Sequence, residues 1–354
     1  MADKVLMKGN EAIAEAAILA GCRHYFGYPI TPQTEVAAYM AKRMPKIGGT
    51  FLQAESEIAA INMVYGVAST GKRVMTSSSS PGISLKGEGL SYLAGADLPA
   101  LVVNVQRGGP GLGGIQPSQS DYFQATKGGA HGDFHMIVLA PDSVQEMAEL
   151  TVRGFELADQ YRMTAMILAD GTMGQMMEPV SLDFKFRDPV EKPWAVTGTG
   201  MKREHNIINS LYLKPDLLEK TNFDRFERYK VIEENEVLYE EYKMEDAEIC
   251  VAAFGIAARV AKNAIDQARE QGVKVGLIRP ITLWPFPTKA FAAAAEKVGH
   301  FLSVELSMGQ MIEDVRLAVN GKAPVSLCNR TGGMIPLPEQ VLDAILSIHN
   351  GGAK

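Results

Sequence analysis

The most chemically informative residue in this sequence is an acid at the start of an apolar helix. Glu57 lies in the segment 53–66, and the helix predicted after it carries no charged side chain. A carboxyl group held against an apolar surface has a raised pKa, because burial disfavours its charged form. Such an acid can share or donate a proton near neutral pH, so Glu57 is a candidate catalytic residue.

Two interpretations of this acid are open at this stage. In the first, Glu57 hydrogen-bonds the aminopyrimidine ring of thiamine diphosphate, which helps that cofactor to lose a proton and to accept electrons from a 2-oxo acid. In the second, Glu57 only complements the helix dipole, as acids often do in a first helical turn. The dipole would lower the carboxyl pKa and so act against the effect of burial.

A tight turn at 27–32 is expected to follow the first strand of a sheet. Open parallel sheets bind ligands beyond the carboxyl ends of their strands, so the Thr31 hydroxyl is a candidate substrate contact. Tyr28 and Pro29 in the same turn are candidate cofactor contacts. The alternative is that Thr31 only caps the next helix, with Pro32 at its first position.

Two more polar segments follow predicted strands. The serine run 77–80 leaves room for a cofactor and offers hydroxyl groups, so Ser79 and Ser80 are candidate cofactor-binding residues. The alternative for this run is a serine-rich turn with a cap. Arg107 opens a glycine-rich loop and is suited to bidentate binding of a carboxylate, with a structural salt bridge as the alternative.

Other motifs are weaker. The GxGxxG match at 109–114 does not open a helix, and the P-loop-like run at 66–73 follows a helix instead of a strand. His131, Asp133 and His135 more often form a polar loop than a metal site. The sequence has no Gly-Asp-Gly followed by Asn at the spacing that holds Mg²⁺ on a diphosphate. If thiamine diphosphate is used, another chain must therefore bind its phosphates.

Composition limits the class of protein. The chain has 354 residues, 46% hydrophobic and 21% charged, which is typical of a globular protein with a large core. Its net charge of −6, without a basic run, argues against nucleic-acid and membrane partners. The three scattered cysteines form no CxxC motif and fit a reducing cytoplasm, so we expect a cytoplasmic protein without its own metal site.

Short apolar strands alternate with amphipathic helices along most of the chain. The first half predicts strands at 23–28, 50–53, 73–77, 98–105, 136–139 and 164–169, with helices at 8–20, 32–44, 56–70, 82–96 and 143–161. The last part predicts strands at 249–254, 273–278, 301–304 and 324–328, with helices at 257–271, 286–298, 310–319 and 338–349. This alternation predicts an α/β fold with two doubly wound parallel-sheet domains.

The chain is therefore expected to have three parts. Residues 1–181 form the first module and residues 247–354 the second. The segment 182–246 between them is rich in proline and charge, and we interpret it as an irregular connecting arm. It either lies over a surface, possibly that of a partner, or is a solvated linker.

Taken together, the segments 27–32, 53–57, 77–82 and 106–119 resemble the α subunit of 2-oxoacid:ferredoxin oxidoreductases, in particular the 2-oxoisovalerate (3-methyl-2-oxobutanoate) branch. The likeness spans essentially the whole chain. The first domain looks like a pyrimidine-binding thiamine diphosphate module. The last domain, with the segment 276–287, looks like the C-terminal domain of transketolase.

The resemblance implies roles by position. Glu57 matches the acid that contacts the aminopyrimidine, and its spacing to Gly66 distinguishes it from the nearby Glu55. Thr31 and Arg107 match the residues that meet the carboxylate and carbonyl of the substrate. The implied reaction is the oxidative decarboxylation of a branched-chain 2-oxo acid, with coenzyme A taking the acyl group and ferredoxin the electrons.

The resemblance also implies partner chains. A β subunit would hold the diphosphate and Mg²⁺, while γ- and δ-type subunits would carry iron–sulfur clusters, in a dimer of heteromers. The alternatives are a scaffold subunit without a catalytic residue, a self-sufficient transketolase-type enzyme, and a pyruvate- or 2-oxoglutarate-specific relative. A 2-oxoglutarate-specific enzyme needs a second cation for the distal carboxylate of its substrate. Lys127, Arg23 and His24 are candidates for this cation.

Overall fold

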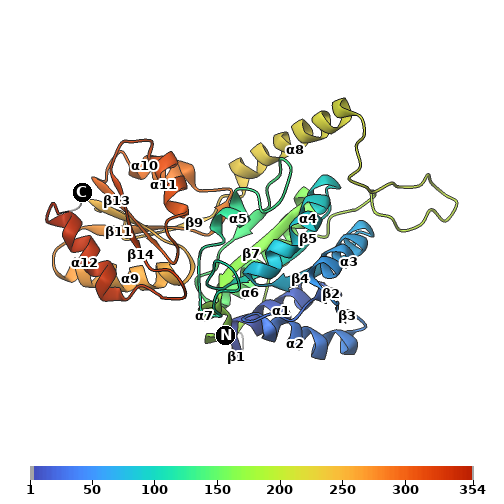
Figure 1. Ribbon diagram of the computed structural model, residues 1–354, viewed down its shortest axis with the longest axis horizontal. Coiled ribbons are helices and arrows are strands. Elements are labelled where there is room, and N and C mark those ends of the chain that lie inside the picture. The colour runs from blue at the N-terminus through green and yellow to red at the C-terminus, as the bar shows by residue number, and fades with distance from the viewer. Residues whose placement is uncertain (1–3, 353–354) are drawn as a thin grey trace.

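The computed structural model describes residues 4–352 and contains two α/β units joined by a long connection (Figure 1). Residues 1–3 and 353–354, which belong to the expected domains 1–181 and 247–354, lie outside the described residues. The two-unit α/β architecture expected from the alternating pattern is confirmed.

The first unit is built on a seven-stranded sheet in the order β12-β6-β7-β5-β4-β2-β3. Its strands are β2 (His24–Gly27), β3 (Thr50–Gln53), β4 (Val74–Ser78), β5 (Ala100–Gln106), β6 (Ile137–Leu139), β7 (Thr164–Asp170) and β12 (Thr282–Trp284). Every neighbouring pair is parallel except β12–β6. The strands β4 to β7 are buried along their whole length, as expected where helices cover both faces.

The helices of the first unit form two packed groups. They are α1 (Gly9–Leu19), α2 (Thr34–Arg43), the 3-10 helix η1 (Met44–Ile47), α3 (Glu57–Ser69), α4 (Ser80–Gly95), α5 (Tyr122–Thr126), α6 (Val144–Tyr161) and α7 (Gly171–Gln175). α1 packs against α2 and α6, whereas α3 packs against α4. A small antiparallel ribbon of β1 (Lys4–Lys8) and β8 (Met177–Ser181) was not predicted and packs beside α6.

The second unit has a five-stranded sheet in the order β14-β13-β10-β11-β9. Its strands are β9 (Tyr239–Tyr242), β10 (Ile249–Ala252), β11 (Val275–Pro280), β13 (His300–Glu305) and β14 (Val325–Asn329). Its helices are α9 (Gly255–Glu270), α10 (Thr288–Ala294), α11 (Met311–Val319) and α12 (Pro338–His349). α9 packs against α12 and α10 against α11, and the added edge strand β9 is antiparallel to β11.

The expectation of an irregular segment at 182–246 is wrong for its second half. This half contains α8 (Pro215–Asn235) and β9. Only Arg225, Tyr229 and Ile232 are buried along the 21 residues of α8. So little burial requires no continuous apolar stripe, and no clear helical pattern is therefore visible in the sequence here. The residues between β8 and α8 contain no helix or strand, and part of this stretch loops away from the body at the right of Figure 1.

Two local predictions also need correction. Helix α2 begins at Thr34 with Gln33 at its N-cap, so Thr31 does not cap it. The C-terminal part of the chain also contributes β12 to the first sheet, where β12 pairs with β6. A strand of three residues is too short to show a periodic apolar pattern. Its pairing with β6 also joins residues that are far apart in the sequence.

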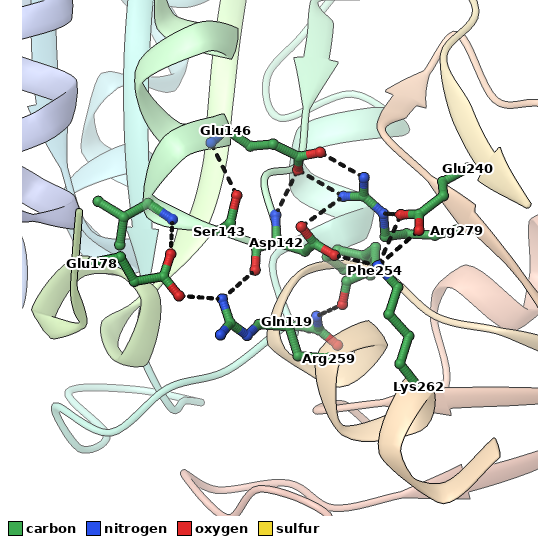
Figure 2. Close-up of polar contacts among 11 residues, drawn as sticks. Gln119, Asp142, Ser143, Glu146, Glu178, Glu240, Phe254, Arg259, Lys262 and Arg279 are labelled. Atoms are coloured by element: carbon green, nitrogen blue, oxygen red, sulfur yellow. Dashed lines mark hydrogen bonds and ion pairs between the residues drawn. The ribbon is translucent and has the colours of Figure 1, made fainter. Parts of the chain in front are cut away.

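Buried ion pairs fasten the two units together (Figure 2). Arg279 on β11 donates two hydrogen bonds to Glu146 on α6, at 2.8 and 2.7 Å. Its Nε donates to Glu240 on β9 at 2.7 Å. The side-chain amide of Gln119 also crosses the junction and donates to the Phe254 carbonyl at 2.8 Å. The ion pair between Arg279 and Glu146 and the hydrogen bond from Gln119 therefore connect the two units. Removing one member of the ion pair would leave the other charge without a partner.

Candidate functional site

The predicted site segments meet at one edge of the first sheet. β5, β4, β2 and β3 are successive parallel neighbours, so their carboxyl ends lie along the same edge. The turn 27–32 follows β2, the N-terminus of α3 follows β3, the serine run ends β4, and Arg107 follows β5. This edge therefore brings together candidates that are up to eighty residues apart in the sequence.

Glu57 is the first residue of α3 and is buried. The Ser56 hydroxyl caps the helix by accepting a hydrogen bond from the Ala59 N–H at 3.1 Å. Glu57 is only 6% exposed, whereas Glu55 is exposed. The fold therefore separates two acids that are two residues apart, and it buries the one that the sequence favoured.

A glycine on α4 makes room for this carboxylate. A Cβ atom at Gly82 would lie 2.8 Å from Glu57 Oε1 and 2.1 Å from Ser78 Oγ. Both distances are far below van der Waals contact, so a larger residue at position 82 would force these two side chains to move. The carboxyl end of β4 and the first turns of α3 and α4 are thus in direct contact at this point.

The serine run is divided between two environments. Ser77 Oγ donates to Gln33 Oε1 at 2.5 Å, on the side of the sheet that holds Tyr25. The hydroxyls of Ser78 and Ser79 are buried, yet neither has a hydrogen-bond partner within residues 4–352. Buried polar groups nearly always have a partner, so these two hydroxyls point to a group that comes from outside this chain.

Ser80 is committed to a local network. Its Oγ donates to Asp121 Oδ2 at 2.6 Å and accepts from the Arg107 N–H at 3.1 Å. Asn104 also donates to Asp121, at 2.9 Å. Burial raises the pKa of Asp121, although the hydrogen bonds from Ser80 and Asn104 oppose this. The network fixes the start of the glycine-rich loop against α4.

Arg107 and Thr31 are brought together through the backbone. The Arg107 guanidinium donates to the Thr31 carbonyl at 3.0 Å and to the Leu112 carbonyl at 3.1 Å, and its Nε has no partner among the described residues. Arg107 makes no ion pair with a described carboxylate, so the salt-bridge interpretation is wrong for this chain in isolation. The Thr31 side chain itself is exposed.

A hollow of about 650 Å³ opens beside Arg107. Its walls come from the start of α4, the glycine-rich loop and the second unit, which contributes Met308, Gln310 and Thr331. Tyr28 is 36% exposed at the same sheet edge, and Pro29 beside it is also exposed. The site is therefore open toward solvent in the isolated chain.

Sequence reasoning missed one charged residue near the site. Lys86 on α4 is 0% exposed, and its Nζ has no hydrogen-bond partner in the described part of the chain. Burial lowers the pKa of Lys86 to about 8, and the negative charge of Glu57 partly opposes this shift. A lysine between apolar residues of a helix is the signal that was overlooked.

The candidates for a second substrate cation lie elsewhere. Lys127 is paired with Asp314. Arg23 donates to the carbonyls of Ile18 and Cys22, and His24 begins β2, at the amino end of that strand. None of the three lines the hollow, in which Arg107 is the only cation contributed by the described part of the chain.

The metal interpretation of His131, Asp133 and His135 gains no support. Within residues 4–352, no group of three or more His, Cys, Asp or Glu side chains is arranged to hold a metal ion. His135 instead stacks on Trp284, with ring centroids 4.7 Å apart. In the same range, no helix is both long and apolar enough to cross a bilayer.

Comparison with known proteins identifies the class. A family model described as pyruvate flavodoxin/ferredoxin oxidoreductase, thiamine diphosphate-binding, matches residues 15–241. A second model, pyruvate:ferredoxin oxidoreductase core domain II, matches residues 247–341. The chain belongs to the 2-oxoacid:ferredoxin oxidoreductase family, as its sequence motifs had indicated.

Among individual relatives, the ketoisovalerate oxidoreductase subunit VorB of Methanothermobacter marburgensis is 53% identical, over 97% of each chain. The 2-oxoglutarate synthase subunit KorA of Methanothermobacter thermautotrophicus is 36% identical, over 99% of this chain and 100% of that one. Both of these relatives are named as subunits of an oxidoreductase.

Solved structures support the fold. A 2-oxoglutarate:ferredoxin oxidoreductase from Magnetococcus marinus, solved with 2-oxoglutarate, coenzyme A and succinyl-CoA, matches with a TM-score of 0.89 at 29% identity. The match covers 98% of this chain but only 65% of that longer chain. An inactive split-gene transketolase tetramer shares the fold, with a TM-score of 0.59 at 11% identity.

Proposed function

We propose that this chain is the α-type subunit of a thiamine-dependent enzyme that oxidises a branched-chain 2-oxo acid. In the overall reaction the 2-oxo acid and coenzyme A give acyl-CoA, carbon dioxide and a proton, and two electrons reduce ferredoxin. Residues 1–181 would be the pyrimidine-binding module, 182–246 a connecting arm, and 247–354 the transketolase C-terminal-like domain.

The observation that carries the proposal is a buried acid beside partnerless hydroxyls. Glu57 is almost fully buried where α3 and α4 begin, and the Ser78 and Ser79 hydroxyls nearby have no described partner. An acid and two hydroxyls in an apolar setting fit the polar edge of an aminopyrimidine ring. Bound thiamine diphosphate would supply the electron sink that decarboxylation of a 2-oxo acid needs.

Each candidate residue then has a stated role. Glu57 holds a proton at the ring, and Ser79 offers a hydroxyl to it. Tyr28 and Pro29 border the ring from the turn after β2. Ser80 acts less directly than the sequence indicated, because its hydroxyl already binds Asp121 and holds the loop in place.

The substrate proposal rests on the charge of the hollow. Arg107 offers one cation for the carboxylate of a 2-oxo acid, and Thr31 lies against it. Among the described residues, no second cation lines the hollow for the distal carboxylate of 2-oxoglutarate, and the Asp121 side chain also lines it, whereas Pro110 and Met308 offer apolar surface. This favours a branched aliphatic side chain, in agreement with the name of the 53% identical relative.

The remaining groups are assigned to other chains. A β subunit would hold the diphosphate and Mg²⁺, γ- and δ-type subunits would carry the iron–sulfur clusters, and the assembly would be a dimer of heteromers. Exposed apolar side chains near the site support this division, because Leu52, Ile58, Leu85 and Leu112 are between 39% and 83% exposed. The cytoplasmic location stays a prediction.

The decisive experiment replaces Glu57 by glutamine in the co-purified complex. We expect ferredoxin reduction to fall by about 10²–10⁴-fold, the usual contribution of an acid–base residue, while the subunits still assemble. Glu55→Gln is the matched control, because Glu55 is exposed and should keep full activity. A non-catalytic scaffold subunit would keep its activity in both variants, and that result would overturn the proposal.

The substrate is tested with a panel of 2-oxo acids on the same complex. We expect 2-oxoisovalerate and its branched homologues all to be used, with specificities that differ by about 10–200-fold, since one methylene is worth about 1–3 kcal/mol. A preference for 2-oxoglutarate would contradict the single-cation argument. A preference for pyruvate would contradict the assignment of an apolar pocket.

A further inference from the structure

Lys86 is a buried cation to which none of the roles above has been assigned. Its side chain is 0% exposed, and its Nζ has no partner among residues 4–352. An ammonium group removed from water without a compensating hydrogen bond or counter-charge is strongly destabilising. A protein that keeps such a residue in its interior therefore uses the charge for a nearby group.

The geometry of α4 places this charge next to Glu57. Lys86 follows Gly82 by four residues on α4, so the two residues share one face of the helix. Gly82 touches the Glu57 carboxylate, as the 2.8 Å distance from a built Cβ shows. One turn beyond Lys86, a Cβ at Gly89 would lie 2.4 Å from Ile61 on α3. The face of α4 that carries Lys86 is thus the face packed on α3.

The direction of the side chain strengthens this relation. Long side chains on a helix lean toward its N-terminus, which for Lys86 means toward Gly82 and the Glu57 carboxylate. The two charged groups are not in direct contact, because Lys86 forms no ion pair with a described carboxylate. The ammonium group therefore interacts with Glu57 through its charge, across the packed interface between α3 and α4.

Within residues 4–352, Glu57 is the charged group that acts most directly on Lys86. The elements that pack most closely on α4 are α3, β5 and β7, together with the backbone of Gly129, which approaches Gly87. Asp121 accepts a hydrogen bond from Ser80 at the start of α4, and Glu88 on α4 itself accepts one from Tyr92. β5 has no ionisable side chain. The ionisable residues on the other two are Glu57 and Tyr65 on α3, and Asp170, which ends β7 and caps α7. Glu57 is the one whose charge opposes the effect of burial on the pKa of Lys86.

We propose that Lys86 is a positioning residue that acts through Glu57, because its buried ammonium group supplies the counter-charge that holds the Glu57 carboxylate at the mouth of α3. The inference rests on the proposed function, in which Glu57 meets the cofactor ring. If Lys86 keeps the Glu57 carboxylate in one orientation, this carboxylate is already positioned when the cofactor ring binds. Less conformational entropy is then lost on binding.

This role predicts a pH dependence with a defined sign. Burial lowers the pKa of Lys86 to about 8, so the amine is charged below that pH and loses its charge as the pH rises through it. The electrostatic attraction between Lys86 and Glu57 is therefore present at neutral pH and lost as the pH rises above about 8. We expect the affinity of the complex for thiamine diphosphate to fall by about tenfold above pH 8, in the absence of substrate.

The test measures the dissociation constant of thiamine diphosphate with Mg²⁺ for the co-purified complex, from about pH 6.5 to 9.5. Lys86→Met should weaken binding by about tenfold at neutral pH and remove the alkaline fall. Lys86→Arg, which stays charged, should restore neutral affinity and keep it constant through pH 8. Leu90→Met, one turn later on α4 and also buried, is the packing control and should keep the parental profile.

A double-mutant cycle with Glu57→Gln separates positioning from packing. If Lys86 acts through Glu57, adding Lys86→Met to Glu57→Gln should change the affinity by less than about twofold. An equal loss in both backgrounds, or a Lys86→Met profile identical to the parental one, would overturn the inference. If Lys86→Met fails to assemble, Lys86→Gln carries the same comparison. A Glu57→Gln complex with unchanged turnover would instead overturn the proposed function.

Discussion

Gly82 packs directly against the Glu57 carboxylate of the candidate site. Gly82→Ala would place a methyl group 2.8 Å from Glu57 Oε1 and 2.1 Å from Ser78 Oγ. Both atoms belong to side chains that can rotate away, so we expect a loss of only about 1 kcal/mol in the free energy of unfolding. The displaced carboxylate should lower turnover by about 10²-fold, which steady-state kinetics and thermal unfolding together will measure.

Gly66→Ala is the matched control for this substitution. Gly66 lies on the neighbouring helix α3, and a Cβ there would meet nothing within 4 Å. Alanine in place of glycine inside a helix usually stabilises by about 0.5–1 kcal/mol, so thermal unfolding of the isolated chain should shift upward. If Gly82→Ala left turnover unchanged, close packing between Gly82 and the acid would not matter for function.

The sequence was most informative about single residues that also occupy a predictable place. Glu57 was distinguished from Glu55 by the spacing to Gly66 that the family resemblance implies, and only Glu57 proved to be buried. Lys86 was missed because a lysine is normally read as solvated, and its burial results from the packing of α4 on α3. Local pattern cannot reveal a contact that two separate helices create.

At the scale of elements, long apolar runs were predicted well. The strand predicted at 98–105 and the helix predicted at 143–161 match β5 and α6 closely, because burial on one or both faces dictates their composition. α8 was missed because only three of its residues are buried, and β9 because it is a half-exposed edge strand. Both elements are stabilised by tertiary contacts more than by their own sequence.

Arg279 is the residue on which the junction between the two units depends. It is 2% exposed and binds Glu146 and Glu240, with Asp142 at 3.4 Å. Arg279→Met leaves Glu146 without a cation, whereas Asp142 and Glu240 keep Lys262, so we expect the free energy of unfolding to fall by about 3 kcal/mol. Lys274→Met is the control, because Lys274 pairs with Glu248 on an exposed surface and should leave stability almost unchanged.

The same substitution should show a pH dependence. Burial opposes ionisation of Glu146, but the hydrogen bonds and charge of Arg279 outweigh it and lower the pKa of this carboxyl below 4.5. The stability that this pair provides is therefore present above pH 4.5 and lost as the pH falls through the lowered value. Denaturant unfolding should show the largest gap between parent and Arg279→Met at neutral pH. A gap that widened in acid would contradict this account.

At the scale of the whole molecule, we propose that this chain supplies one side of a site that it shares with another chain. The residues expected to meet a pyrimidine ring and a carboxylate lie along one sheet edge that is open in the isolated chain. The sequence offers no motif for magnesium on a diphosphate. We expect the purified chain alone to bind thiamine diphosphate with Mg²⁺ at least about 10²-fold more weakly than the complex, as calorimetry would show. Equal affinity would favour a self-sufficient enzyme of the transketolase type.

The connection between β8 and α8 bears on assembly. It carries Ile207, Leu211 and Leu213, which are 71% to 84% exposed in the isolated chain. Residues 208 and 210 between them pack on the body, so these three apolar side chains lie on the outer side of a surface segment, where such groups usually become buried against a partner. Replacing Leu211 and Leu213 by Asp should leave the unfolding temperature of the isolated chain unchanged, because both are on the surface. It should reduce the yield of the co-purified complex in size-exclusion chromatography. Leu317→Asp, an equally exposed position on α11, should assemble normally, and equal yields for all three proteins would exclude the loop from the subunit interface.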